Sequence, residues 1–145
     1  MAFRFTLDSV LRVRESVEEK EEQVLQKAQF EVERVRQRID ELTEELAQAN
    51  RERNEALLHA TEAYRLQDLQ AGIEAAKEAR QTLLETLETL KAERDRQMKI
   101  YQAARSGRQM LSDLETQQRG EWEVEQTRMQ QKRIDDIFAA RFQRG

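Results

Sequence analysis

Apolar and small residues recur at alternating steps of three and four over the second half of the chain. Such steps average about 3.5 residues, the period that keeps one stripe of a helix against a partner in a left-handed coiled coil. The chain contains no Pro, so nothing of that kind breaks the pattern, which predicts one long helix over residues 62–142. Its expected stripe is Leu66, Leu69, Ile73, Ala76, Leu83, Leu87, Leu90, Tyr101, Ala104 and Leu111.

A similar stripe predicts a first helix over residues 8–59. Asp8 or Ser9 is expected to cap its start, because either side chain accepts hydrogen bonds from the first free amides of a helix. From Val32 onward the steps are strict heptads, whereas the steps before it follow an eleven-residue spacing that relaxes the supercoil. The expected stripe is Val10, Val13, Val17, Val24, Ala28, Val32, Val35, Ile39, Leu42, Leu46, Ala49, Ala56 and Ala60.

The two stripes cover each other if the chain turns back at residues 60–62, with Thr61 capping the second helix. In an antiparallel pair the residue numbers of facing positions have a constant sum, here about 122, so that Val35 faces Leu87. The predicted fold is therefore all-α: one domain, residues 1–145, forming a long antiparallel two-helix coiled coil, an α-hairpin, with a longer, protruding C-terminal helix.

Charges agree with this register. Arg34, Arg36 and Arg38 would face Glu85 and Glu88. An acidic cluster of the first helix would face Lys99, Arg105 and Arg108, the cluster being Glu15, Glu18, Glu19, Glu21 and Glu22. Exposed pairs of this kind contribute well under about 1 kcal/mol each, so they select the register rather than hold the fold.

From about residue 115 the longer helix has no cover in this register. Trp122 and Met129 keep the heptad phase, while Ile134, Phe138 and Phe142 form a separate i, i+4, i+8 stripe. Large apolar residues on an uncovered helix indicate a partner surface, unless the tail folds back or is disordered. The partner is either a second copy of the chain or another protein. Near the other end, the N-terminal aromatics either pack on the neighbouring helix or contact a partner.

The composition suits long helices, because 37% of the residues are charged, 6% are aromatic and only four are Gly. Disorder of the whole chain is the alternative, against which the regular apolar spacing argues. A net charge of −4 argues against nucleic acid, although both ends are basic and the middle is acidic. No apolar run is long enough for a membrane helix, and Arg4 and Asp8 interrupt the first apolar patch, so we expect a cytoplasmic protein without a secretory signal.

No catalytic arrangement emerges from the residues. The single His59 falls at the expected turn, where a solvated side chain is the ordinary outcome, and no Gly-rich phosphate loop or Cys is present. The acidic residues follow helix-surface spacing rather than that of a metal site. We therefore expect a non-enzyme without cofactor or metal that acts by shape and contact. Two open alternatives are a structural coiled coil that homodimerises through its overhang, and a binder of membrane or nucleic-acid surfaces through its basic ends.

Three stretches of the chain carry a family resemblance. They are Phe3-Arg4-Phe5-Thr6-Leu7 with Val10, Leu11 and Arg14; Arg108, Leu111 and Leu114; and Gln131, Lys132, Asp135, Asp136 and Arg141. With these stretches and its two-helix body, the chain resembles the FliJ family, the coiled-coil proteins of bacterial flagellar type III export, over nearly the whole length. The chain departs from the family at Gln130, where an acidic residue is usual, and at Asp136, where Glu is usual.

The resemblance implies a monomeric rod, similar to the central stalk of rotary ATPases, that engages the ring of the export ATPase FliI and promotes its assembly. It implies further contacts with the export gate protein FlhA and with export chaperones, a role in motility, and an indirect, peripheral position at the inner face of the cell membrane. Leu42 and Ala79 are the implied gate contacts. The implied ring contacts are Phe3, Phe5, Trp122, Arg128, Met129, Lys132, Arg133, Ile134, Phe138 and Phe142.

Overall fold

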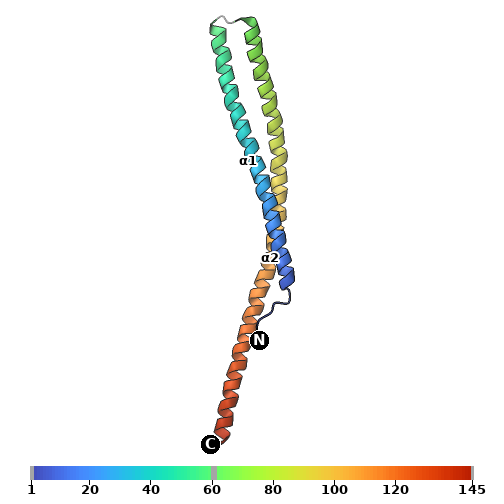
Figure 1. The fold of residues 1–145 in the computed structure, drawn as a ribbon, viewed down its shortest axis with the longest axis vertical. Helices are drawn as coiled ribbons and strands as arrows, with labels where there is room; N and C mark the ends of the chain where they lie inside the picture. Colours follow the sequence, from blue (N-terminus) through green and yellow to red (C-terminus); the bar gives the residue numbers. More distant parts are fainter. Residues whose placement is uncertain (1, 60–61, 145) are drawn as a thin grey trace. The chain divides into compact units, whose positions relative to one another are not determined.

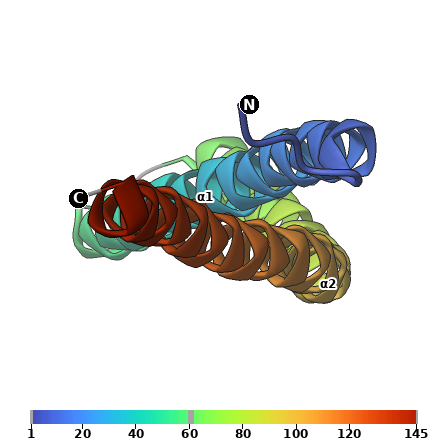
Figure 2. The same cartoon turned by 90° about the horizontal axis from the view of Figure 1, so that it is seen from below.

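The computed structural model describes residues 2–59 and 62–144, and these form two helices, α1 (Asp8–Leu58) and α2 (Ala63–Arg144). The helices run alongside each other in opposite directions (Figures 1 and 2). The described residues contain no strand. The predicted all-α, antiparallel two-helix coiled coil is thereby confirmed, while the expected cap Thr61 lies outside the described residues.

The start of α1 differs from the expected cap. Leu7 precedes the helix, and its carbonyl accepts a hydrogen bond from the Leu11 N–H at 2.9 Å. Asp8 is the first helical residue, and its carboxylate lies 3.2 Å from Nε of Arg12. Asp8 therefore stabilises the helix through its charge in the first turn, where the helix dipole favours an anion.

The chain divides into two compact units, each built from both helices. We call Glu21–Tyr101 the hairpin unit, and Met1–Lys20 with Gln102–Gly145 the terminal unit. In the hairpin unit, one cluster joins the α1 residues Val32, Val35 and Ile39 to buried Leu87 and to residues packed against it, namely Leu83, Leu84 and Leu90. The predicted register places three of these α2 residues, Leu83, Leu87 and Leu90, opposite the α1 residues, so packing of the apolar stripe fixes the pairing. Leu84 lies outside the predicted stripe.

Polar contacts in the hairpin unit follow the same register. Arg53 donates from Nη1 to Oε1 of Gln70 at 2.9 Å, and Arg80 donates from Nε to Oγ1 of Thr43 at 2.9 Å. The predicted pairing of Arg34 and Arg38 with acidic residues of α2 is wrong. These arginines pair within α1 instead, Arg34 with Glu31 and Arg38 with Glu41 and, two turns along, Glu45, because carboxylates at these spacings lie on the same face of the helix.

The first third of α1 buries a different face from the one its valines predicted. Val10, Val13, Val17 and Val24 are 39–62% exposed, whereas Leu11 and Leu25 are each 5% exposed. The buried positions continue the strict heptad phase of the later residues, so the expected eleven-residue spacing is wrong. Glu18 and Glu21 take the inward-facing positions between the two leucines, because Arg108 and Gln97 of α2 bond to them.

Gly72 lowers the stability of α2, and a substitution there can raise it. It lies inside the helix, and a Cβ added there would meet no atom within 4 Å. We expect Gly72→Ala to raise the free energy of unfolding by about 0.5–1 kcal/mol, because Ala loses less backbone entropy on folding. Thermal unfolding followed by circular dichroism measures this. The reverse exchange at exposed Ala71 on the same helix, Ala71→Gly, is the control and is expected to lower the stability by a similar amount. An unchanged or lowered melting temperature for Gly72→Ala would contradict the prediction.

Candidate partner-binding surface

The N-terminal segment, residues 2–7, packs on α2 within the terminal unit. The ring of Phe3 lies 6.0 Å from that of Trp122, centroid to centroid, with a tilt of 55°. Cζ of Arg119 lies 5.1 Å from the Phe3 centroid, and Phe5 is only 5% exposed. The N-terminal aromatics therefore cover α2 as far as Trp122, which answers the question of whether they pack within the chain.

The uncovered part of α2 consequently begins beyond Trp122 rather than near residue 115. A start near residue 115 would follow if only the helical residues of α1 covered α2, but the N-terminal segment extends that cover. We call residues 123–144 the free helix. Among its residues only Gln126 is partly covered. Its large apolar side chains are 47–90% exposed, namely Val124, Met129, Ile134, Ile137, Phe138 and Phe142.

The free helix presents a well-defined apolar face. Ile134, Phe138 and Phe142 follow one another at intervals of four residues, and Ile137 lies three residues after Ile134. Residues at these spacings lie on the same side of a helix. Met129 lies on a different face, in the heptad phase of Trp122. The free helix thus has one continuous apolar stripe toward its end that the described part of the chain leaves uncovered.

Positive charge accompanies this stripe. From Arg128 onward the free helix holds five basic residues and two acidic ones. The acidic residues are Asp135, which accepts a hydrogen bond from Nε2 of Gln131 at 3.1 Å, and Asp136. The basic residues are Arg128, Lys132, Arg133, Arg141 and Arg144, all of them exposed. A partner for this surface would need apolar contacts and acidic groups.

The implied contact residues therefore fall into two groups. Arg128, Met129, Lys132, Arg133, Ile134, Phe138 and Phe142 share the free helix and are all exposed. The N-terminal aromatics and Trp122 contact one another or pack within the terminal unit. The gate residues divide in the same way, because Leu42 is 5% exposed within the helix pair whereas Ala79 lies on the surface.

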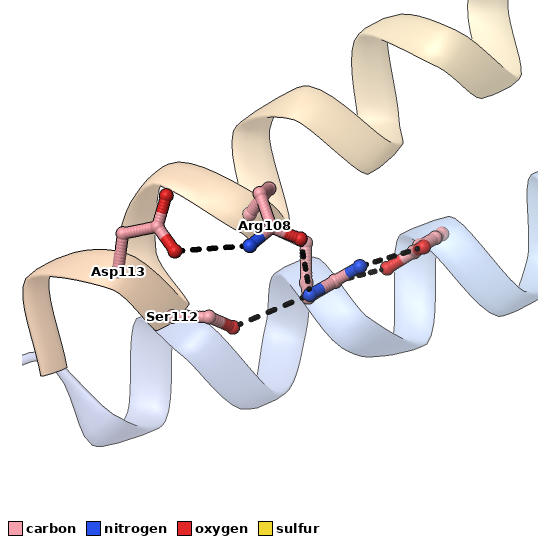
Figure 3. A network of polar contacts seen from close by, with 5 residues as sticks. Arg108, Ser112 and Asp113 are labelled. Atoms are coloured by element: carbon pink, nitrogen blue, oxygen red, sulfur yellow. Dashed lines mark hydrogen bonds and ion pairs between the residues drawn. The ribbon is translucent and has the colours of Figure 1, made fainter. Parts of the chain in front are cut away.

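A polar network joins the two helices of the terminal unit (Figure 3). Arg108 donates from Nε to Oε2 of Glu18 at 2.6 Å and from Nη2 to Oε1 at 3.3 Å. Its Nη1 reaches Oγ of Ser112, while Gln109 bonds to both Arg108 and Asp113. The side chains of Arg108 and Glu18 are only 23% and 17% exposed. The sequence predicted that the acidic cluster faces Arg108, and the bidentate ion pair of Arg108 with Glu18 confirms it.

The pair gives the stability of the terminal unit a dependence on pH. The hydrogen bond from Arg108 lowers the pKa of Glu18 below its ordinary value of 4.5, and the charges of Arg108 and Arg105 lower it further against the opposing effect of partial burial. A group whose pKa is lower in the folded than in the unfolded chain stabilises the fold above its unfolded pKa. That contribution is lost as the pH falls from about 4.5 through the folded-state value.

We expect Glu18→Gln to lower the free energy of unfolding at pH 7 by about 1 kcal/mol, since a neutral amide makes a weaker bond to Arg108. The difference from wild type should shrink as the pH falls below about 4.5, because Glu18 itself then becomes neutral. Chemical denaturation at several pH values measures both effects. Glu19→Gln, at the exposed neighbouring carboxylate, is the control. A difference from wild type that stays constant down to pH 3 would contradict the prediction.

Within the described residues, neither helix contains an apolar stretch long enough to cross a membrane, and no group of acidic residues and His is arranged to hold a metal ion. The geometry offers contact surfaces and a polar helix pair. A role in contact or assembly is the function that these surfaces support.

Comparison with known proteins identifies the family to which the chain belongs. The chain matches the family model described as flagellar FliJ protein over residues 3–145. Neither the curated proteins nor the solved structures contained a match. The family match covers both helices, the N-terminal aromatics and the free helix. The chain therefore belongs to the flagellar FliJ family, the coiled-coil proteins associated with flagellar protein export.

Proposed function

We propose that this FliJ-family chain acts as a central stalk of flagellar export, with its free helix seated in the ring of a FliI-like export ATPase whose assembly it promotes. The observation that supports this most directly is the apolar stripe of the free helix, whose large side chains are at least 47% exposed. A helix of roughly 22 residues is about 33 Å long and about 10–12 Å across, dimensions suited to entering a ring pore.

The symmetry of the two partners shapes the contact. One helix has no rotational symmetry, so it cannot present the same side chain to every subunit of a symmetric ring at once. Contacts are therefore distributed over apolar residues such as Phe138 and basic residues such as Arg133, each of modest strength. Weak, distributed contacts suit a stalk that assembles a ring without locking it.

The remaining partners of the proposal are a FlhA-like export gate and export chaperones, at the inner face of the membrane. For the gate, exposed Ala79 stays in the proposed contact. Leu42 is buried, with 5% exposure, and is therefore left out of the proposed contact. We propose that the chain works as a monomer, since the helix pair already covers its own apolar core in the hairpin unit. The proposed role requires no cofactor.

The proposal is tested by titrating the full-length protein into a FliI-type ATPase, with turnover and ring assembly measured in parallel. We expect both to rise with protein concentration. Analytical ultracentrifugation of the protein alone should give a monomer with a high frictional ratio. An ATPase unaffected by the protein, together with an obligate dimer in which Phe138 is protected, would favour the alternative of a structural coiled coil that homodimerises through the free helix.

A further inference from the structure

The N-terminal segment in front of α1 packs on α2 in a non-helical conformation. Residues 2–5 have no regular secondary structure, and the Asp8 N–H donates to the Phe5 carbonyl at 3.2 Å where the chain turns into α1. Phe5 is buried, whereas Phe3 is only half-buried against Trp122. The segment is thus anchored at Phe5 and more loosely held at its outer end.

Under Phe3, α2 presents a site for a flat aromatic side chain. The guanidinium of Arg119 lies over the Phe3 ring, and the tilted Trp122 indole completes the site from one turn further along α2. Nη2 of Arg119 donates a hydrogen bond to Oε1 of Glu115 at 3.4 Å, an ion pair that orients the guanidinium. Cation–π and tilted aromatic contacts both recognise an aromatic ring without requiring a particular neighbouring sequence. We call Glu115, Arg119 and Trp122 the aromatic seat.

The aromatic seat adjoins the free helix, which is the proposed partner-binding surface. Trp122 is the residue immediately before the free helix, on the same continuous α2. A partner that encloses the free helix from its C-terminal end reaches the seat about two helical turns after it passes Met129. Cation–π and aromatic contacts at a partly exposed site are individually small, so Phe3 can be exchanged for a similar side chain at little cost.

We propose that the N-terminal segment is a displaceable clasp: Phe3 fills the aromatic seat in the free protein, and an aromatic side chain of the partner that receives the free helix replaces it. The identity of that partner as the export ATPase rests on the proposed function. The seat and the clasp rest on the contacts of Phe3, Arg119 and Trp122. The two parts are therefore tested separately.

Trp122 is the only Trp of the chain, so its fluorescence reports on the seat directly. Phe3→Ala should increase quenching of Trp122 by acrylamide and shift its emission to longer wavelength, because the indole loses its cover. Phe30→Ala, which removes an aromatic ring that is 67% exposed on α1 in the hairpin unit, is the matched control and should change neither quantity. Unchanged quenching in Phe3→Ala would overturn the clasp.

The exchange is tested by a double-variant cycle on activation of a FliI-type ATPase by the full-length protein. Phe3→Ala should lower the concentration for half-maximal activation by about two- to tenfold, because the partner no longer competes with Phe3. Arg119→Ala should raise that concentration, and adding Phe3→Ala to it should bring no gain, because the seat itself is damaged.

The outcomes separate the two proposals. Equal or weaker activation by Phe3→Ala, with the wild type active, overturns the exchange and leaves the stalk proposal standing. An equal gain from Phe3→Ala with and without Arg119 also overturns the exchange, since the seat is then not where the partner binds. Failure of the wild type to activate the ATPase overturns the proposed function and the exchange, while the quenching result still decides whether Phe3 covers Trp122.

Discussion

Replacing Leu87 by Ala is expected to lower the free energy of unfolding by about 2–4 kcal/mol. Leu87 is the one buried α2 residue of the cluster in the hairpin unit, at 7% exposure, and it packs against Val32, Val35 and Ile39 of α1. Truncation removes apolar area from the interface and leaves a cavity that a pair of helices closes only in part. Urea unfolding followed by circular dichroism at 222 nm measures the loss.

Leu58→Ala provides a matched control, because it makes the same exchange at a helical Leu that is 83% exposed. Its effect is expected to stay within about 0.5 kcal/mol, as is usual for surface positions. If the two Leu→Ala variants were equally stable, the interface between α1 and α2 would not be held at Leu87, and the register built on that residue would be wrong.

The second large effect is expected at the free helix. Replacing Phe138 and Phe142 together by Ala should raise the concentration of protein needed for half-maximal ATPase ring assembly by about tenfold, because two of the modest apolar contacts are lost at once. The helicity should stay close to that of wild type, since these side chains are 68% and 90% exposed and Ala favours helix. Turnover, ring assembly and circular dichroism are measured on the same samples.

Phe30→Ala again supplies the control, as an exposed Phe outside the free helix, and should leave ring assembly unchanged. Full ring assembly by the Phe138 and Phe142 double variant would remove the free helix from the proposed contact. A loss of assembly shared equally by Phe30→Ala would show a general effect of removing surface aromatics rather than a contact at the free helix.

The antiparallel pair was predictable from the chain because its central apolar residues repeat with the heptad period in both helices. Val35 and Leu87 illustrate this: the register that joins them follows from matching two stripes around one turn, and the structure packs both in one cluster. The same register places Arg108 near the acidic cluster, where Glu18 is found. Periodicity determines such features because it depends only on helix geometry.

The seat of Phe3 could have been found from the same rule. The predicted register places residue 3 opposite residue 119, and the cation–π contact of Arg119 with Phe3 lies at that position. From the sequence alone, the N-terminal aromatics can be interpreted either as packing residues or as partner contacts. Because the segment is not helical, helix periodicity does not predict that it packs on α2; the register gives only the position that Phe3 takes once it does.

By itself, the sequence determined two long antiparallel helices, their register, and an apolar basic end without cover, because each of these follows from spacing and charge along the chain. Only the tertiary structure decided which face of early α1 is buried and where the cover ends. A charged pair such as Glu18 with Arg108 can take an inward-facing position once both partners are present, and this turns Val10 and Val17 outward. The hydrophobic pattern of one helix does not show which residue of the other helix will pair with a charged side chain and allow it to be buried.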